Sequence, residues 1–121
     1  MATFSKIILS GSTNGQGIPV TATTASQGSL LHTAVTGSAG SVDEVYVYVH
    51  STVTTIATIK FAYGPTTATG SRFSYTVTAD DLSGLHLAFP GLVMNGAIAL
   101  KAYATTANII NCFGFVNRLA S

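Results

Sequence analysis

Alternation with a period of two is the sequence feature that most restricts the fold of this chain. In the segment 43–51, DEVYVYVHS, valines alternate with Tyr46, Tyr48 and His50. Because successive side chains of a strand point to opposite faces, this pattern predicts a strand with one apolar and one amphipathic face. Two interpretations of the tyrosine face stay open: it packs on a second sheet, or it contacts another molecule.

Further runs rich in β-branched and aromatic residues predict more strands. They cover residues 4–9, 17–23, 29–36, 53–63, 71–78, 85–89, 97–105 and 107–119. Short clusters of Gly, Asn, Ser and Thr separate these runs and are typical of turns. We therefore expect an all-β fold: a single antiparallel β-sandwich or jelly-roll-like domain of about eight strands, spanning residues 1–121.

Four segments carry more specific expectations. Pro90-Gly91 is expected to end the strand that begins at Leu85, and residues 79–84 to form at most one helical turn. The C-terminal run 107–119 is apolar on both faces, so it is either a central strand or a strand covered by another chain. Residues 1–17 are either an extended N-terminal arm or an ordinary first strand followed by a loop.

The composition restricts the partners of such a domain. Only 7% of the residues are charged, whereas 18 Thr and 12 Ser supply polar surface; about 25% charged is usual. A net charge of +1 argues against nucleic acid as a partner, and 47% apolar residues argue against disorder. No apolar run reaches the length of a membrane span or of a signal peptide, so we expect synthesis in the cytoplasm and no membrane partner.

Residues that could support catalysis are few. Ser, His and Asp all occur, but no G-x-S-x-G elbow does. Asp80 and Asp81 are adjacent and would point to opposite faces of a strand or cap a turn. The pair Asp43-Glu44 is interpreted as a solvated strand entrance. We expect no catalytic residues and no enzyme activity.

Metal and cofactor motifs are also missing. His32, His50 and His86 lack the close spacing of zinc motifs and are interpreted as partly exposed strand histidines. The Gly64–Gly70 segment has no following Lys, so it is not a phosphate loop. Cys112 has the apolar neighbours Ile110 and Phe113, which predicts a buried, inert thiol. We expect neither a metal nor a cofactor.

The C-terminal third resembles a known class of proteins. The stretch 85–119, LHLAFPGLVMNGAIALKAYATTANIINCFGFVNRL, is similar to the ending of small structural proteins of tailed-phage virions. The segments SGSTNGQGIPVTAT (10–23) and DEVYVYVHS (43–51) also look similar to members of that group. The resemblance implies a bacteriophage capsid decoration (cement) protein on the outer surface of the head. Its implied partner is the major capsid protein, and it implies a homo-oligomer, with a trimer as the expected state.

We expect a protein partner to be contacted through apolar and aromatic side chains. The expected interface comprises residues of the N-terminal segment, of the tyrosine strand and of the C-terminal strand: Phe4, Ile7, Tyr46, Tyr48, His50, Phe113 and Phe115. The alternative is a carbohydrate- or receptor-binding module of a phage fibre or tail, in which the tyrosines would stack on sugar rings. The absence of Trp favours the first interpretation.

Overall fold

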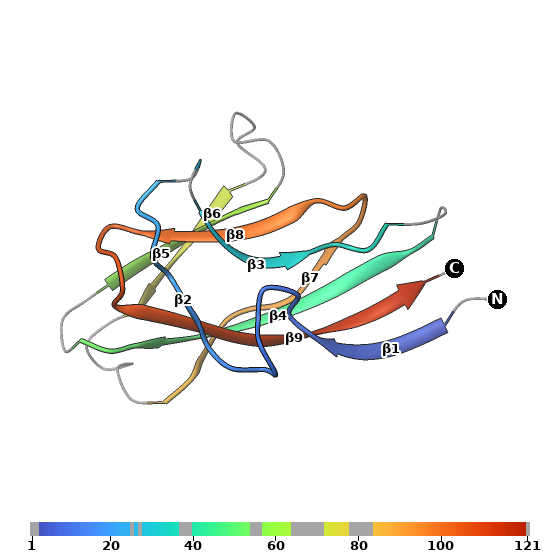
Figure 1. Cartoon of the computed structure of the whole chain (residues 1–121), viewed down its shortest axis with the longest axis horizontal. Helices are drawn as coiled ribbons and strands as arrows, with labels where there is room; N and C mark the ends of the chain where they lie inside the picture. Colours follow the sequence, from blue (N-terminus) through green and yellow to red (C-terminus); the bar gives the residue numbers. More distant parts are fainter. Residues whose placement is uncertain are drawn as a thin grey trace.

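The chain forms two antiparallel sheets (Figure 1). The computed structural model describes residues 3–24, 26, 28–36, 40–53, 57–63, 72–77 and 84–120. Their strands are β1 (Thr3–Ile8), β2 (Ile18–Pro19), β3 (Ser29–Thr33), β4 (Val42–Ser51), β5 (Ala57–Tyr63), β6 (Arg72–Val77), β7 (His86–Met94), β8 (Ala99–Ala104) and β9 (Ile110–Ala120). Sheet A has the order β1-β9-β4-β7, with β2 also paired to β9, and sheet B has the order β3-β8-β5-β6. The predicted all-β sandwich is confirmed.

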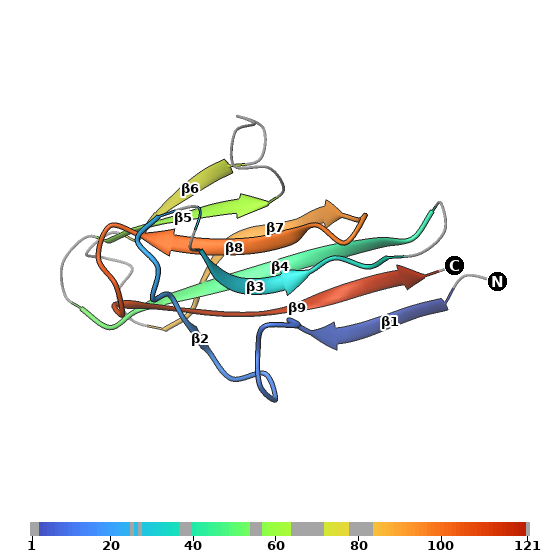
Figure 2. The same cartoon turned by 45° about the horizontal axis from the view of Figure 1, so that its top comes forward.

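The strand pairs are nested along the chain. β5 pairs with β6, β4 with β7, β3 with β8 and β1 with β9, all antiparallel. A long hairpin of such nested pairs, rolled into two facing sheets, is a jelly roll, an architecture that occurs in viral capsid and lectin domains. Both chain ends therefore lie at the same end of sheet A, as Figures 1 and 2 show.

The core lies between the sheets and follows the alternation in the sequence. The valines of β4 at positions 45, 47 and 49 are fully buried. From sheet B, Ile59 and Phe61 are fully buried against the same cluster. The Phe61 ring packs edge-on against Phe89 of β7, with ring centroids 5.0 Å apart. The tyrosine face of β4 consequently points away from the core, which excludes the interpretation that it packs on the second sheet.

Strand β7 differs from the expectation. It does not end before Pro90-Gly91 but continues to Met94, and its pairing with β4 shifts register on both sides of Val47. Gly91 has a φ of 78°, which a glycine adopts without strain. β7 is the edge strand of sheet A, and a proline, which lacks an N–H donor, is tolerated in an edge strand or at a bulge. These irregularities explain why Leu87 faces outward while Phe89 faces the core.

The terminal segments are ordinary members of sheet A. Residues 3–8, considered as part of an extended arm, form β1 and pair with β9 over six residues. β9 itself lies between β1 and β4 and is therefore a central strand. The helical turn expected at 79–84 lies outside the described residues except for Gly84.

Gly114 of β9 has no room for a side chain beside β4. A Cβ atom at this position would overlap the carbonyl oxygen of Tyr46 and lie 3.2 Å from Leu9 Cδ1. We predict that Gly114→Ala lowers the free energy of unfolding by about 2 kcal/mol or more, because the added methyl group forces the two strands apart. Urea denaturation measures this, with Thr33→Ala on the exposed side of β3 as a control. Equal stability of wild type and Gly114→Ala would contradict this packing.

Candidate functional site

The outer face of sheet A, defined as the side chains of this sheet that point away from sheet B, carries a ladder of aromatic rings. Tyr46 of β4 lies opposite Phe115 of β9, and Tyr48 lies opposite Phe113. The Tyr46 and Phe115 rings are stacked, with centroids 4.7 Å apart and planes 9° apart. From the β1 side, Lys6 Nζ lies 4.6 Å from the Phe115 ring centroid. The Phe115 ring is therefore engaged within the chain by an aromatic stack and by a cation.

Polar side chains hold this ladder in place. Tyr46 Oη donates a hydrogen bond of 2.9 Å to Glu44 Oε1, and Asn117 Nδ2 donates one of 3.3 Å to the same oxygen. The hydrogen bond to Glu44 raises the pKa of Tyr46 above its usual value. Among the described residues, Glu44 and Lys6 are the charged residues of this face, one of each sign.

Exposed apolar side chains gather on the same face. Among the described residues, seven large apolar side chains are exposed, and strand registers place five of them here. The five are Phe4, Ile8, Leu87, Val93 and Leu119. Phe4 is 69% exposed and Val93 is 58% exposed, although both lie within paired strands. Several exposed apolar side chains on one face of a sheet are typical of a contact site.

The structure brings together six of the seven expected interface residues. Those on the outer face of sheet A are Phe4, Tyr46, Tyr48, His50, Phe113 and Phe115. Ile7 is on the opposite face of β1 and packs against the core, so it is not part of this surface. Sequence reasoning missed Leu87 and Val93, because the irregular register of β7 decides which of its side chains face outward.

A second, buried cluster joins the two sheets. Asp43 of β4 is fully buried and receives hydrogen bonds from His32 Nε2 at 2.7 Å and from Arg118 Nε and Nη2 at 2.8 and 2.9 Å. The backbone N–H of Val35 donates a further bond at 3.0 Å. His32 comes from sheet B, whereas Asp43 and Arg118 come from sheet A. This cluster corrects the interpretation of Asp43 as a solvated residue and of His32 as a partly exposed one.

The cluster is arranged as a structural contact rather than a catalytic triad. Ser10 donates its backbone N–H to His32 Nδ1 at 3.1 Å, so Nδ1 carries no proton and the Nε2–H donates to Asp43. The Ser10 hydroxyl accepts the N–H of Thr33 at 2.7 Å and does not reach the imidazole as a nucleophile would. Among the described residues, no buried side-chain N or O atom lacks a hydrogen-bond partner.

The buried carboxylate predicts a pH dependence of stability. Burial alone would raise the pKa of Asp43, but hydrogen bonds from Arg118 and His32 and the charge of Arg118 outweigh it and hold the pKa below 3.8. A carboxyl group whose pKa is lower in the folded state than in the unfolded state stabilises the fold at pH values above its unfolded-state pKa. This stabilisation is lost as the pH falls through the folded-state pKa. We predict that the difference in unfolding free energy between wild type and Asp43→Asn shrinks as the pH falls below about 5. A difference that stays constant as the pH falls would contradict the assignment.

Other candidate groups remain separate from one another. His50 is half-buried on the outer face of sheet A and its Nδ1–H donates to the Gly84 carbonyl at 3.0 Å. Cys112 is fully buried, as predicted, and burial raises the pKa of its thiol to about 12. Within the described ranges, no three His, Cys, Asp or Glu side chains converge on a possible metal site. Asp80 and Asp81 lie outside these ranges.

Comparisons with known proteins add nothing to the fold described above. Protein-family models, curated proteins and solved structures were compared with the chain, and none of them matched. In the part of the chain that the structure describes, no helix is long and apolar enough to cross a membrane. The chain is an all-β sandwich with an aromatic, apolar outer face on one sheet.

Proposed function

We propose that this protein is a non-enzymatic structural protein of a tailed-phage virion that decorates the capsid as a homo-oligomer, a trimer. The observation that carries the proposal is the gathering of exposed apolar side chains on the outer face of sheet A. The resemblance of residues 85–119 to small virion proteins supports the phage context. The jelly roll is compatible with this role, although the same fold serves many others.

The chemistry of the outer face of sheet A suits protein contacts between copies of this chain. Phe4, Leu87 and Val93 offer large apolar contacts, and the stacked rings at the centre are rigid. Rigid aromatic anchors lose little conformational entropy on binding. Lys6 and Glu44, the charged residues that the structure describes on this face, have opposite signs, so together they do not oppose its approach to a second copy. A homo-oligomer built in this way leaves sheet B and the sheet edges for the capsid.

A decoration protein of this kind acts by mass action. It binds the assembled shell and not the free capsid subunits, so binding stabilises the assembled form. Several copies joined in one oligomer bind neighbouring capsid sites together, which raises the overall affinity without new contacts. Neither step needs a reactive side chain.

The aromatic ladder supports carbohydrate binding less well. A sugar-stacking platform needs an exposed ring face, whereas the Phe115 ring already stacks on Tyr46 and contacts Lys6. The Tyr46 hydroxyl also donates a hydrogen bond to Glu44 of the same chain. A glycan array with the purified protein separates the alternatives, because saturable glycan binding that Tyr48→Ala abolishes would favour the carbohydrate-binding module.

Copy number in virions tests the proposed function. Virions of the phage that encodes this chain would be purified and their proteins quantified by gel densitometry against the major capsid protein. We expect hundreds of copies of the 12.4 kDa chain per particle. A few copies, or a few dozen, would indicate a tail, portal or fibre component, and absence from the particle would contradict the proposal.

A further inference from the structure

The outer face of sheet B, directed away from sheet A, concentrates positive charge. In β5, Lys60 pairs with Ser74 of β6 and with Tyr103 of β8. Two residues along, Ala62 pairs with Arg72 and Lys101 in the same way. Because residues two apart in a strand share a face, these side chains form two adjacent rows on one surface. Three of the five basic side chains of the chain, Lys60, Arg72 and Lys101, belong to these rows.

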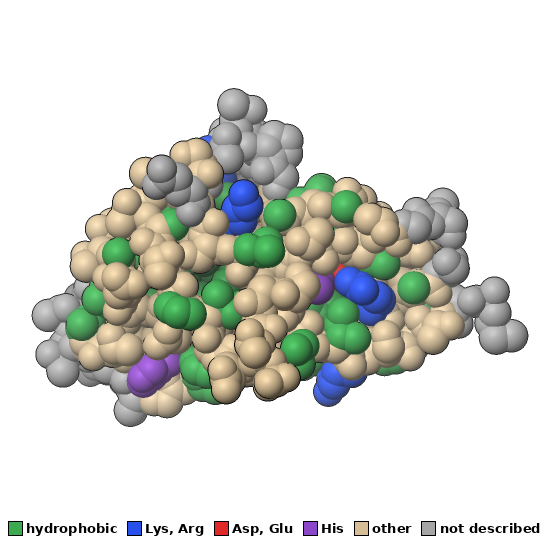
Figure 3. Space-filling model, in the orientation of Figure 1, with side chains coloured by type: hydrophobic (Ala, Val, Ile, Leu, Met, Phe, Trp, Pro, Cys, Tyr) green, Lys and Arg blue, Asp and Glu red, His purple; other side chains and the backbone are tan. Residues whose placement is uncertain are grey.

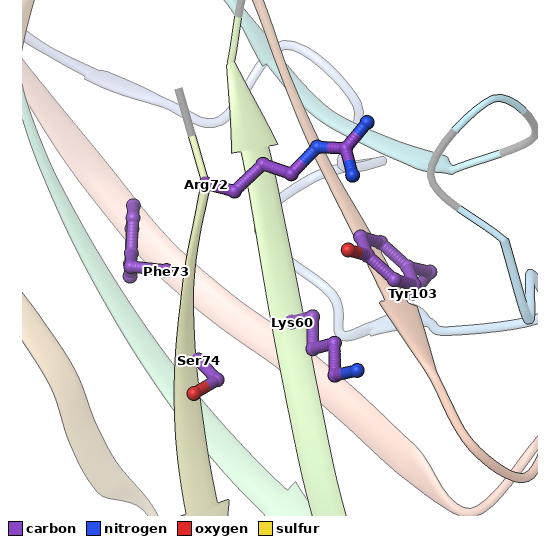
Figure 4. Close-up of a pocket in the computed structure, with 5 residues that line it drawn as sticks. All are labelled: Lys60, Arg72, Phe73, Ser74 and Tyr103. Carbon is purple, nitrogen blue, oxygen red and sulfur yellow. The ribbon is translucent and has the colours of Figure 1, made fainter. Parts of the chain in front are cut away.

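A shallow depression of about 210 Å³ lies within this surface, lined by Lys60, Arg72, Phe73, Ser74 and Tyr103. In Figure 4 the Arg72 guanidinium and the Lys60 ammonium group both extend toward β8, and the Tyr103 ring lies between their ends in this view. Phe73 points to the other side of β6, where its ring stacks on Phe61 of the core at a centroid distance of 5.1 Å. The core contact of Phe73 thus anchors the strand that carries Arg72 and Ser74.

The electrostatics of the depression favour an anion. The acidic residues among the described part of the chain, Asp43 and Glu44, both belong to β4 of the other sheet. Figure 3, in the orientation of Figure 1, shows scattered blue basic side chains over both sheets and almost no red on the face that is visible. Among the described residues, no acidic side chain of sheet B offsets the field of this cluster.

The hydrogen-bond donors that line the depression indicate which kind of anion it binds best. Arg72 offers a planar fork of N–H donors, Lys60 offers a point charge, and the hydroxyl groups of Ser74 and Tyr103 offer two further donors. A phosphate monoester carries close to two negative charges and three acceptor oxygens, so it matches two cations and several donors better than a single carboxylate does. The volume of the depression accommodates a phosphate group with a small attached moiety.

We propose that the depression lined by Lys60, Arg72, Ser74 and Tyr103 binds a phosphate monoester group. The phosphate oxygens contact the guanidinium and the ammonium group, and the moiety that carries the phosphate lies against the Tyr103 ring. The site is on the sheet opposite the proposed oligomer contact, so it does not depend on the virion role and both can be tested separately.

Titration of the ¹⁵N-labelled protein followed by NMR tests the site. The probes are inorganic phosphate, glucose 6-phosphate and glucose. We expect saturable shifts of the amides of β5, β6 and β8 with both phosphates at millimolar concentration, weakening as NaCl is raised. Tighter binding of glucose 6-phosphate than of inorganic phosphate would assign a phosphosugar-type ligand, whereas equal binding would assign the phosphate group alone. Absence of saturable shifts, or equal binding of glucose, would overturn the proposal.

Variants locate the binding on these residues. Lys60→Gln combined with Arg72→Gln should weaken phosphate binding at least about tenfold, because both charged contacts are lost. Lys6→Gln removes one charge from the other sheet and should leave the affinity within about twofold. Arg72→Lys keeps the charge without the fork and should give an intermediate affinity. An equal loss in Lys6→Gln and in the double variant would show a non-specific charge effect and overturn the site, and retained amide dispersion reports that each variant is folded.

Discussion

Replacing Asp43 by Asn is expected to lower the free energy of unfolding by about 3 kcal/mol. The carboxylate accepts four hydrogen bonds, from the Val35 N–H, from His32 and twice from Arg118. An Asn side chain offers one acceptor oxygen and places an amide donor among these donors. His32 is fully buried and cannot turn to water for a new partner, and Arg118 loses its counter-charge. Urea denaturation at pH 7 measures the loss.

Glu44→Gln is the matched control for Asp43→Asn. It makes the same chemical change at the adjacent residue of the same strand, on the half-buried outer face of sheet A. The Gln side chain retains an oxygen that can accept from Tyr46 and Asn117. We expect a loss of no more than about 1 kcal/mol. Equal losses in the two variants would mean that the buried cluster is not a main tie between the sheets.

Replacing Leu87 by Glu is expected to abolish self-association. Leu87 is 41% exposed on the outer face of sheet A, so the folded subunit tolerates a charge there. In an assembly the same charge would be buried without a partner at each contact. A cost of about 3 kcal/mol per contact corresponds to a weakening of more than about 100-fold. Sedimentation velocity at micromolar concentration measures the change.

The matched control for Leu87→Glu is Leu30→Glu. Leu30 is 40% exposed, but it belongs to sheet B, where it lies on β3 and pairs with Lys101 of β8. The two variants therefore differ in location and not in side chain or exposure. Self-association should persist in Leu30→Glu. Loss of self-association in Leu30→Glu with retention in Leu87→Glu would place the contact on sheet B.

Local alternation in the sequence was sufficient to predict the layers of the fold. Valines 45, 47 and 49 are buried as predicted, and β9 alternates Phe113 and Phe115 on the outside with Cys112 and Val116 inside. Strand β7 was not predicted correctly, because its course through Pro90-Gly91 depends on its edge position and on a shifted register. Such features arise from pairing with a strand distant in sequence and leave no local signal.

The buried cluster did leave a signal that sequence reasoning overlooked. Asp43 is in phase with the buried valines of β4, and Arg118 is in phase with Cys112 and Val116 of β9. A carboxylate on a buried face requires a cation or several donors. The third member, His32, could not be assigned in this way, because only the packing of β3 over sheet A brings it to Asp43.

The molar mass of the wild-type protein in solution tests most directly whether copies of this chain cover the outer face of sheet A. Sedimentation equilibrium would be measured from about 1 to about 100 µM protein. A trimer of 12.4 kDa subunits is the result that the proposed assembly predicts, with Leu87→Glu sedimenting as a monomer. A wild-type protein that stays at 12.4 kDa over the whole range would contradict it.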